Sequence, residues 1–221
     1  MKAMILAAGR GERLRPLTDT VPKPLVPIAG KPLIVHQLGW LRRAGVREIV
    51  INVWHLADQI VACLQDGSAW GVRIRWSRES ELLDTGGGIA NARHLLGAEP
   101  FILLNGDIWA DYDFARLVDR PNDDPHLVLT PKPDFKPTGD FSLVGDRVAR
   151  PEPSLRTLTY CGIAVLQRSL FSNIDTPVFS LTRDLLFHET RAGRVSGEIF
   201  LGAWYDIGTP TQLNQVRKVA E

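Results

Sequence analysis

The sequence predicts an α/β protein in which helices cover both faces of a mostly parallel, mixed β-sheet. Apolar runs alternate with segments of helical period from the first residues onward, which is the pattern of parallel strands joined by crossover helices. The run Ile49-Val50-Ile51 is continuous and β-branched, as in strands covered on both faces. A chain of 221 residues with 44% hydrophobic and 23% charged side chains is long enough for one core of ordinary globular composition.

In the first half, strands and helices are expected in strict alternation. Gly45 marks the end of the first long helix, because glycine accepts the left-handed conformation that closes a helix. The periodicity predicts strands at residues 2–7, 47–53, 72–76 and 101–105, and helices at 33–44, 56–64 and 89–96.

The second half is less regular. The pattern predicts strands at residues 126–130, 158–166 and 199–204, a hairpin over 141–148, and helices at 181–191 and about 211–220. A proline-rich stretch over 131–139 is typical of a long loop. No linker or repeat separates the halves, so we interpret residues 1–221 as a single domain in which 121–221 form a smaller lobe.

Charge and composition exclude several classes of protein. The chain carries 26 basic and 25 acidic side chains, whereas a nucleic-acid binder normally shows a basic face. No apolar run approaches the roughly 20 residues that span a bilayer, and no signal peptide is evident, so we expect a cytoplasmic protein without a membrane partner. Spacing leaves a disulfide between Cys63 and Cys161 open, but a buried pair of reduced thiols is the expectation in the cytoplasm.

A glycine-rich loop follows the first strand and gathers positive charge. Gly9 and Gly11 let backbone N–H groups approach a charged ligand, and Arg13 and Lys23 add cationic donors. A solvated surface loop is the alternative for any single cation, but the grouping directly after a strand favours a phosphate-binding loop. The loop lacks the third glycine of the dinucleotide fingerprint, and no Gly-Lys-Ser/Thr of a P-loop follows it. Between Gly9 and Lys31 the basic residues are Arg10, Arg13, Arg15, Lys23 and Lys31, against the acidic Glu12 and Asp19.

Two aspartates follow apolar runs later in the chain. Asp107 comes after the predicted strand at 101–105, and Asp206 after the run at 199–204. Ligands of open parallel sheets lie beyond the carboxyl ends of the strands, so Asp107 should share an edge with the loops after Ala8 and Trp76. Magnesium needs only one or two carboxylates besides water and phosphate oxygens, which makes both aspartates candidate Mg²⁺ ligands. An Asx turn is the alternative for each.

The loop residues match a known signature. Leu6 to Arg13 (Leu-Ala-Ala-Gly-x-Gly-x-Arg), followed by Lys23-Pro24, resembles the signature of the sugar-1-phosphate nucleotidyltransferases. The resemblance implies a Rossmann-like, three-layer α/β/α nucleotidyltransferase fold, similar to glycosyltransferase-A folds, with 1–120 as the nucleotide-binding half and 121–221 as the sugar-binding lobe. It also implies that Arg13 and Lys23 are catalytic, and that the nucleotide contacts Leu6, Ala8, Gly9 and Gly11.

The resemblance extends to the aspartates and to a second glycine run. Trp204 to Pro210 (Trp-x-Asp-Ile-Gly-Thr-Pro) matches a family motif, which implies that Asp107 and Asp206 hold Mg²⁺. The glycines of Leu83 to Ile89, expected before a helix, would suit either a hinge or a flat surface under a base. The family packs this position on the nucleobase, which implies base contacts for Thr85, Gly86 and Gly87. Glu79 stands where relatives carry a base-reading side chain, and as an acceptor it fits uracil or guanine.

On the acceptor side, the resemblance implies that the sugar contacts Asn105, Gly139, Asp140, Tyr160 and Gly162. Where relatives often show Val-x-Glu-Lys-Pro, residues 148–153 carry Arg150, so a sugar-binding acid is missing or displaced. An acceptor with its own carboxylate, such as N-acetylmuramate, would explain Arg150, and a solvated arginine is the alternative. Pro137 to Leu143 (Pro-x-Gly-Asp-Phe-x-Leu) also resembles the uridylyltransferases that act on N-acetylmuramate 1-phosphate in peptidoglycan recycling.

The implied function is Mg²⁺-dependent transfer of a uridylyl group from UTP to a sugar 1-phosphate, with release of pyrophosphate. The acceptor phosphate is already charged at neutral pH, so the reaction needs no general base. Alternatives are a mannose-1-phosphate guanylyltransferase or a cytidylyltransferase and, from another class, a silent regulatory protein that binds nucleotide sugars. The presence of Lys23, Asp107 and Asp206 argues against the silent protein. The expected partners are the two small-molecule substrates, and the expected state is a monomer or small homo-oligomer.

Overall fold

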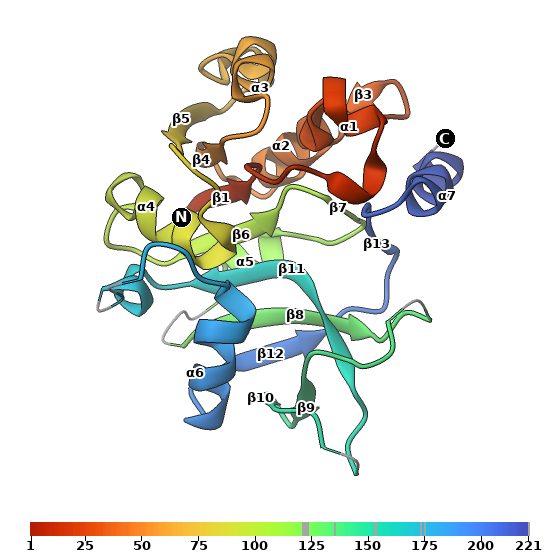
Figure 1. Cartoon of the computed structure of the whole chain (residues 1–221). Coiled ribbons are helices and arrows are strands. Elements are labelled where there is room, and N and C mark those ends of the chain that lie inside the picture. Colours follow the sequence, from red (N-terminus) through yellow and green to blue (C-terminus); the bar gives the residue numbers. More distant parts are fainter. Residues whose placement is uncertain (121–123, 135, 153, 173, 175, 221) are drawn as a thin grey trace.

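One nine-stranded sheet runs through both halves of the chain. The computed structural model describes residues 1–120, 124–134, 136–152, 154–172, 174 and 176–220. The strand order is β5-β4-β1-β6-β11-β8-β12-β10-β9, which runs from top to bottom in Figure 1. Phe135 of the predicted loop and Pro153 after Arg150 lie outside the described residues.

The first four strands in this order are parallel, as the alternation predicts. They are β5 (Arg73–Arg78), β4 (Glu48–Val53), β1 (Lys2–Leu6) and β6 (Phe101–Asn105), and the crossovers contain α2 (Leu33–Arg43), α3 (Ala57–Leu64) and α4 (Asp84–Leu96). Met4 of β1 is paired with Val50 on one side and with Leu103 on the other. Because these strands point the same way, their carboxyl ends meet at one edge of the sheet.

The second half extends the same sheet with mixed directions. β11 (Leu158–Leu166) is antiparallel to both β6 and β8 (His126–Pro131), and β12 (Ser196–Ile199) is parallel to β8. The hairpin of β9 (Ser142–Val144) and β10 (Arg147–Ala149) closes the edge. Smaller elements are α1 (Leu17–Thr20), β2 (Pro27–Ile28), β3 (Lys31–Pro32), β7 (Ile108–Ala110), α5 (Ala115–Val118), α6 (Phe187–Arg191), β13 (Trp204–Asp206) and α7 (Pro210–Ala220), with 3₁₀ turns at Glu12–Leu14, Lys23–Leu25, Ser68–Trp70 and Arg168–Phe171.

Two apolar cores fill the two faces of the sheet. On one face, Leu38 of α2 and Ile60 of α3 pack with the strands, and on the other, Ile89 of α4 packs with Phe101. A third cluster joins α7 to the segments after β1 through Leu14, Ile207 and Leu213. This cluster carries the C-terminal motif to the glycine-rich loop, and α7 accordingly lies beside the first segments of the chain in Figure 1. None of the described helices is long and apolar enough to cross a bilayer.

The predicted strand at 199–204 is wrong. β12 ends at Ile199, the chain crosses out of the main sheet over four residues, and β13 begins at Trp204 and pairs with β7. Apolar residues continue through the crossing because Phe200 packs into the core, while a side chain at Gly202 would overlap the Phe200 ring. The helix predicted at 181–191 is also modified, since residues 181–186 are wound as a π-helix before α6 begins.

The helix predicted to start at Ile89 begins five residues earlier, at Asp84. The glycine run therefore lies inside α4 and is no flexible approach to it. Glycine disfavours a helix on propensity alone. Tertiary packing explains the choice, since a Cβ at Gly86 would overlap the Phe179 ring and one at Gly87 would overlap the Pro177 carbonyl. The cysteines also differ from expectation, because both are free thiols but Cys63 is exposed and only Cys161 is buried.

Candidate active site

A cavity of about 750 Å³ opens at the edge where the carboxyl ends of the parallel strands meet. Its walls come from the glycine-rich loop, the turn after β6, the approach to α4 and Val178 of the second half. The predicted shared edge is therefore confirmed. The predicted site residues that line the cavity are Leu6, Ala8, Gly9, Gly11, Arg13, Lys23, Thr85, Asn105 and Asp107.

The glycine-rich loop carries free amides along the cavity. Residues 8–11 all line it, and none of their N–H groups donates to another described residue. Ala7 N–H donates to Asn52 Oδ1 at 2.9 Å, which fixes the point where the loop leaves β1. Thr18 Oγ1 donates to the carbonyl of Gly11 at 2.8 Å, where φ is +66°. Consecutive free N–H groups of this kind form an anion-binding concavity.

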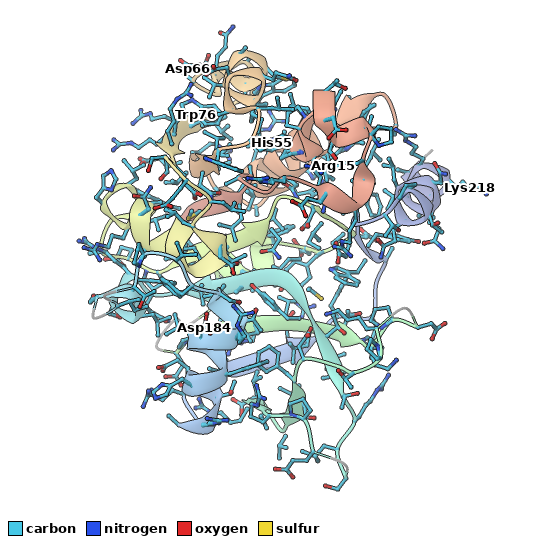
Figure 2. All side chains as sticks on the ribbon, viewed as in Figure 1. Arg15, His55, Asp66, Trp76, Asp184 and Lys218 are labelled. Atoms are coloured by element: carbon cyan, nitrogen blue, oxygen red, sulfur yellow. The ribbon has the colours of Figure 1, made fainter. Side chains whose placement is uncertain are left out.

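The loop after β4 supports the phosphate loop from outside the cavity. His55 is labelled in Figure 2. Its Nε2 lies 2.9 Å from the carbonyl oxygen of Thr18, and the Arg10 guanidinium lies 4.8 Å from the centre of the Trp54 ring. A cation over an aromatic face is attracted by the ring quadrupole. The Arg10 contact holds the loop directly, whereas the His55 contact holds α1, whose Thr18 is bonded to Gly11.

Lys23 and Asp107 form a direct charge pair in the cavity. Lys23 Nζ lies 2.7 Å from Asp107 Oδ2, and the two side chains are 11% and 31% exposed. Lys23 begins a 3₁₀ turn after α1, whereas Asp107 follows β6, so the fold joins two segments far apart in sequence. The pair therefore places one cation and one carboxylate in the cavity that residues 8–11 also line.

The β13–β7 ribbon brings the second aspartate to the first. Asp206 pairs with Ile108, and the Ile207 N–H donates to the carbonyl of Asp107 at 2.9 Å. Trp204 Nε1 donates to the Cys161 carbonyl at 2.9 Å, which fastens the ribbon to β11. Backbone pairing therefore brings the two aspartates together, although they lie far apart in sequence.

Asp206 is held in an environment that disfavours its negative charge. Burial raises the pKa of Asp206, the carboxylate of Asp107 raises it further, and Lys23, Arg13 and Lys136 act in the opposite direction. Its Oδ1 is buried without a hydrogen-bond partner among the described residues. An unpaired buried carboxylate oxygen beside a second carboxylate suits a hard divalent cation. No third acidic, histidine or cysteine side chain completes a cage in the described chain, so such a cation would need substrate oxygens or water.

Arg13 reaches from the phosphate loop to the C-terminal motif. A Cβ added to Gly208 would lie 2.5 Å from Arg13 Nη2, so the guanidinium lies directly against the Gly208 backbone. Both residues line the cavity. Arg13, Lys23 and Asp107 therefore line the same cavity, whereas Asp206 does not line it and is joined to the Asp107 turn through the β13–β7 ribbon.

Gln37 positions the turn that carries Asp107, and the sequence analysis missed it. Its side chain is fully buried in α2, and Nε2 donates to the carbonyls of Asn105 and Ile108 at 2.9 Å each. These two carbonyls flank Asp107. A polar residue on the apolar face of a predicted helix is the signal that would have found Gln37.

Glu79 lies behind the cavity wall. Oε1 accepts from Asn52 Nδ2 at 2.7 Å and Oε2 accepts from the Leu83 N–H at 3.4 Å. Burial raises the pKa of Glu79, and these hydrogen bonds offset part of the increase. Asn52 itself lines the cavity, although the sequence analysis did not select it. Asn52 could have been found from the sequence, because it is a polar residue within the apolar run of β4. Base contact by Glu79 stays a prediction.

The glycine run of α4 supports a segment from the second half. The N–H groups of Gly86 and Gly87 donate to the Phe179 carbonyl at 2.9 and 3.2 Å, and Thr85 Oγ1 accepts from the Leu181 N–H at 2.9 Å. These hydrogen bonds hold the segment that includes Val178, which is 45% exposed and lines the cavity. Base contacts by Thr85, Gly86 and Gly87 stay predictions, since the amides of both glycines are engaged here.

Of the predicted sugar contacts, only Asn105 lines the cavity; Gly162 lies against it, and Gly139, Asp140 and Tyr160 lie together beside the start of β11. Gly162 has φ of +72° in the irregular part of β11, and a Cβ there would lie 2.8 Å from Asn105 Cγ. Asp140 Oδ2 accepts from the Tyr160 N–H at 3.0 Å, and Gly139 lies against Leu158. Arg150 lies apart from these residues, since its guanidinium stacks 3.6 Å from the centre of the Phe187 ring.

The amino-acid sequence is similar to those of known proteins. The nucleotidyl transferase family model matches residues 2–139. The chain is 45% identical over 227 residues to an N-acetylmuramate alpha-1-phosphate uridylyltransferase from Neisseria meningitidis serogroup B, covering 100% of this chain and 98% of that protein. It is 34% identical to a mannose-1-phosphate guanyltransferase from Aspergillus fumigatus, covering 95% of this chain but 61% of that protein.

Solved structures share the fold at low sequence identity. A Bacillus anthracis protein superposes with a TM-score of 0.88 at 20% identity, over 100% of this chain and 95% of that one. HddC from Yersinia pseudotuberculosis, solved with GMP-PN, gives a TM-score of 0.83 at 24% identity, over 100% and 99% of the two chains. These similarities show that the α/β arrangement is shared.

Proposed function

The chain belongs to the nucleotidyl transferase family, and on that premise we propose that it transfers a uridylyl group from UTP to N-acetylmuramate 1-phosphate. The single observation that carries the choice of substrates is the end-to-end match, at 45% identity, to a uridylyltransferase of that name. The guanyltransferase relative is less similar, and the chain spans only 61% of it.

The proposed reaction exchanges one phosphoanhydride bond for another at the α-phosphorus. An oxygen of the acceptor phosphate bonds to the α-phosphorus of UTP, the bond from that phosphorus to the bridging oxygen of the β-phosphate breaks, and pyrophosphate leaves with the electron pair. The attacking oxygen is already anionic, so no proton has to be removed. The protein has to align two anions and stabilise charge on the leaving group.

The residues around the cavity suit these tasks. The free amides of residues 8–11 and the Arg13 guanidinium would hold the β- and γ-phosphates, because both present several donors to phosphate oxygens. Lys23, which is mostly buried beside Asp107, would exchange its carboxylate partner for a phosphate oxygen near the reacting centre. Asn105 and the group around Gly162 would contact the sugar.

We also propose that Asp107 and Asp206 hold Mg²⁺ during the reaction. The buried, unpartnered Oδ1 of Asp206 and its closeness to a second carboxylate support this assignment. When bound, Mg²⁺ would neutralise phosphate charge at the reacting centre. We further propose a cytoplasmic role in peptidoglycan recycling, without nucleic-acid or membrane partners, as a monomer or small homo-oligomer.

The decisive experiment is a pyrophosphate-release assay that crosses UTP, GTP, CTP and dTTP with four acceptors in the presence of Mg²⁺. The acceptors are the 1-phosphates of N-acetylmuramate, N-acetylglucosamine, glucose and mannose. We expect UTP with N-acetylmuramate 1-phosphate to give the highest kcat/KM. A preference for GTP with mannose 1-phosphate would replace the proposed substrates. Absence of pyrophosphate in every pair would favour a silent nucleotide-sugar binder.

A further inference from the structure

Hydrogen bonds through Asn52 and Glu79 join the glycine-rich loop to the approach of α4. Asn52 Oδ1 accepts from the Ala7 N–H at 2.9 Å, and Asn52 Nδ2 donates to Glu79 Oε1 at 2.7 Å. Glu79 Oε2 in turn accepts from the Leu83 N–H at 3.4 Å. Ala7 begins the glycine-rich loop, and Leu83 directly precedes α4, so these bonds connect two walls of the cavity.

The two side chains are buried beneath α4. Asn52 is 3% exposed and Glu79 is 8% exposed. The Glu79 N–H donates to the carbonyl of Val53 at 3.0 Å, which ties the end of β5 to β4. A Cβ added to Gly88 would lie 2.7 Å from both Asn52 Nδ2 and Glu79 Oε1. The third glycine of the run therefore lets the α4 backbone lie directly on this pair.

The chemistry of the pair is set by the two backbone groups at its ends. The N–H groups of Ala7 and Leu83 can only donate. An amide side chain between them offers one acceptor and one donor, so the next side chain has to accept from both directions. The carboxylate of Glu79 does so, and it turns Asn52 Oδ1 towards the loop. A glutamine at position 79 would leave one of the two N–H groups unpaired, whichever way its amide were turned.

Glu79 and Asn52 lie on different sides of the cavity wall. Asn52 lines the cavity, whereas Glu79 lines a separate hollow of about 520 Å³ together with Trp54 and Arg78. Both oxygens of Glu79 accept the hydrogen bonds described above. The charged neighbours in that hollow, Arg78 and Asp58, pair with each other at 2.9 Å. The contact that leads from Glu79 to the cavity is therefore the Asn52 amide.

We propose that Asn52 and Glu79 are positioning residues that hold the free amides of residues 8–11 in place for the triphosphate, and that Glu79 acts through Asn52 and not on the base. This inference rests on the proposed function, in that a nucleoside triphosphate occupies the cavity. The free amides follow Ala7 directly, so a displacement of Ala7 moves them all. Loss of a hydrogen-bonded support of this kind should weaken triphosphate binding by roughly 10-fold to 100-fold.

The test measures dissociation constants by calorimetry with Mg²⁺ present. The probes are UTP and inorganic tripolyphosphate, which carries the phosphates without a base. Asn52→Leu nearly keeps the side-chain volume but removes both hydrogen bonds, so it should weaken both probes by the stated factor. The acceptor KM should stay within about twofold of wild type. Ser77→Ala is the matched control and should change none of these values. Ser77 pairs with Asn52 in the sheet, and its Oγ accepts from Asn91 Nδ2 at 3.2 Å.

A second comparison reverses the sign of one substitution. Glu79→Gln alone should weaken UTP binding, because it leaves one N–H unpaired. Asn52→Asp alone places two carboxylates together, which share a proton at low pH and repel each other when both are ionised. Its affinity for UTP should therefore fall as the pH rises. Adding Glu79→Gln to Asn52→Asp should restore binding at alkaline pH, because the glutamine amide can donate to the aspartate and accept from the Leu83 N–H.

Several outcomes would overturn the inference. Unchanged affinity for both probes in Asn52→Leu, or an equal loss in Ser77→Ala, would remove the positioning role. Weaker UTP binding with unchanged tripolyphosphate binding would show that the pair serves the base. Should Asn52→Leu not fold, the aspartate and glutamine variants decide, and failure of Glu79→Gln to improve Asn52→Asp would contradict the inference. Absence of pyrophosphate release by the wild type contradicts the proposed function alone, because UTP binding still tests the pair. A wild type that does not bind UTP contradicts both.

Discussion

Replacing Lys23 with methionine tests how the charge pair in the cavity works. The substitution keeps the length of the apolar stem and removes only the ammonium, which lies 2.7 Å from Asp107 Oδ2. In the proposed reaction that ammonium stabilises charge on the phosphates as pyrophosphate departs. Removing one preorganised donor at such a centre costs on the order of 10²–10³ in kcat, or about 2.7–4 kcal/mol of transition-state stabilisation. We expect a loss of this size in Lys23→Met.

Stability and Mg²⁺ affinity should respond differently from turnover. Asp107 stays 31% exposed and keeps its contact with water, so the free energy of unfolding should change by no more than about 1 kcal/mol. Without the ammonium, less positive charge offsets the repulsion between the carboxylates of Asp107 and Asp206. A divalent cation should then bind more tightly, by about threefold to tenfold on a screened Coulomb estimate.

The measurements are pyrophosphate release at saturating substrates, thermal unfolding, and the Mg²⁺ concentration that gives half-maximal turnover. Lys31→Met is the matched control, because Lys31 belongs to the same cationic stretch but is exposed and does not line the cavity. Near-wild-type turnover in Lys23→Met would refute the role of Lys23. Lower turnover together with weaker Mg²⁺ affinity would contradict this role of Lys23, since it would mean that Lys23 holds the aspartate site together.

Three further substitutions test other parts of the structure. Gln37→Leu leaves the buried carbonyls of Asn105 and Ile108 without a donor, so it should lower the free energy of unfolding by about 2–4 kcal/mol and reduce turnover; urea unfolding that matches the wild type would contradict this. Gly162→Ala places a Cβ against Asn105 on a backbone with φ of +72°. We therefore expect about 1–3 kcal/mol of destabilisation and a higher acceptor KM. Wild-type stability and acceptor KM in this variant would show that β11 relaxes around the added methyl group. Glu198 has its pKa lowered, first by His126 at 3.6 Å and also by Tyr112, whose hydroxyl donates at 2.9 Å. Glu198→Gln should therefore cost about 1–3 kcal/mol at pH 7. The difference from wild type should shrink as the pH falls below about 4.3 and through the lower folded pKa; a pH-independent difference in urea unfolding would rule out the ionic contribution.

The regular half of the fold could be predicted because local pattern and tertiary structure agree there. β1, β4 and β6 are apolar runs buried on both faces, and they begin and end within one residue of expectation. The prediction of a strand at 199–204 was wrong because different residues of this apolar run are apolar for different reasons. Ile199 ends a strand of the main sheet, whereas Phe200 fills the core while the chain crosses to β7. Nothing local to this run shows where one sheet is left for another.

The glycine run shows a different limit of prediction. Three consecutive glycines oppose a helix by propensity, yet α4 begins at Asp84 because Phe179 and Pro177 occupy the space where side chains would stand. Those partners lie at least 90 residues away in sequence. Local propensity therefore gave the wrong start, and long-range packing decided it.

The candidate site divides in the same way. Residues within contiguous motifs, such as Gly9, Arg13 and Asp107, were found because the motif carries their chemistry. Asn52 was missed because it belongs to no motif, and the sheet topology brings it to the cavity. Arg150 was placed near the acceptor by its position in sequence, but its side chain stacks on Phe187.

In the proposed reaction the uridylyl group of UTP, with its α-phosphorus, passes to the acceptor phosphate. The most direct test follows UTP labelled with ³²P at the α-phosphate in one reaction and at the γ-phosphate in a parallel one, each with N-acetylmuramate 1-phosphate and Mg²⁺. We expect the α-label to move into the UDP-sugar and the γ-label into pyrophosphate. Recovery of the α-label as UMP, or of the γ-label as inorganic phosphate alone, would contradict it.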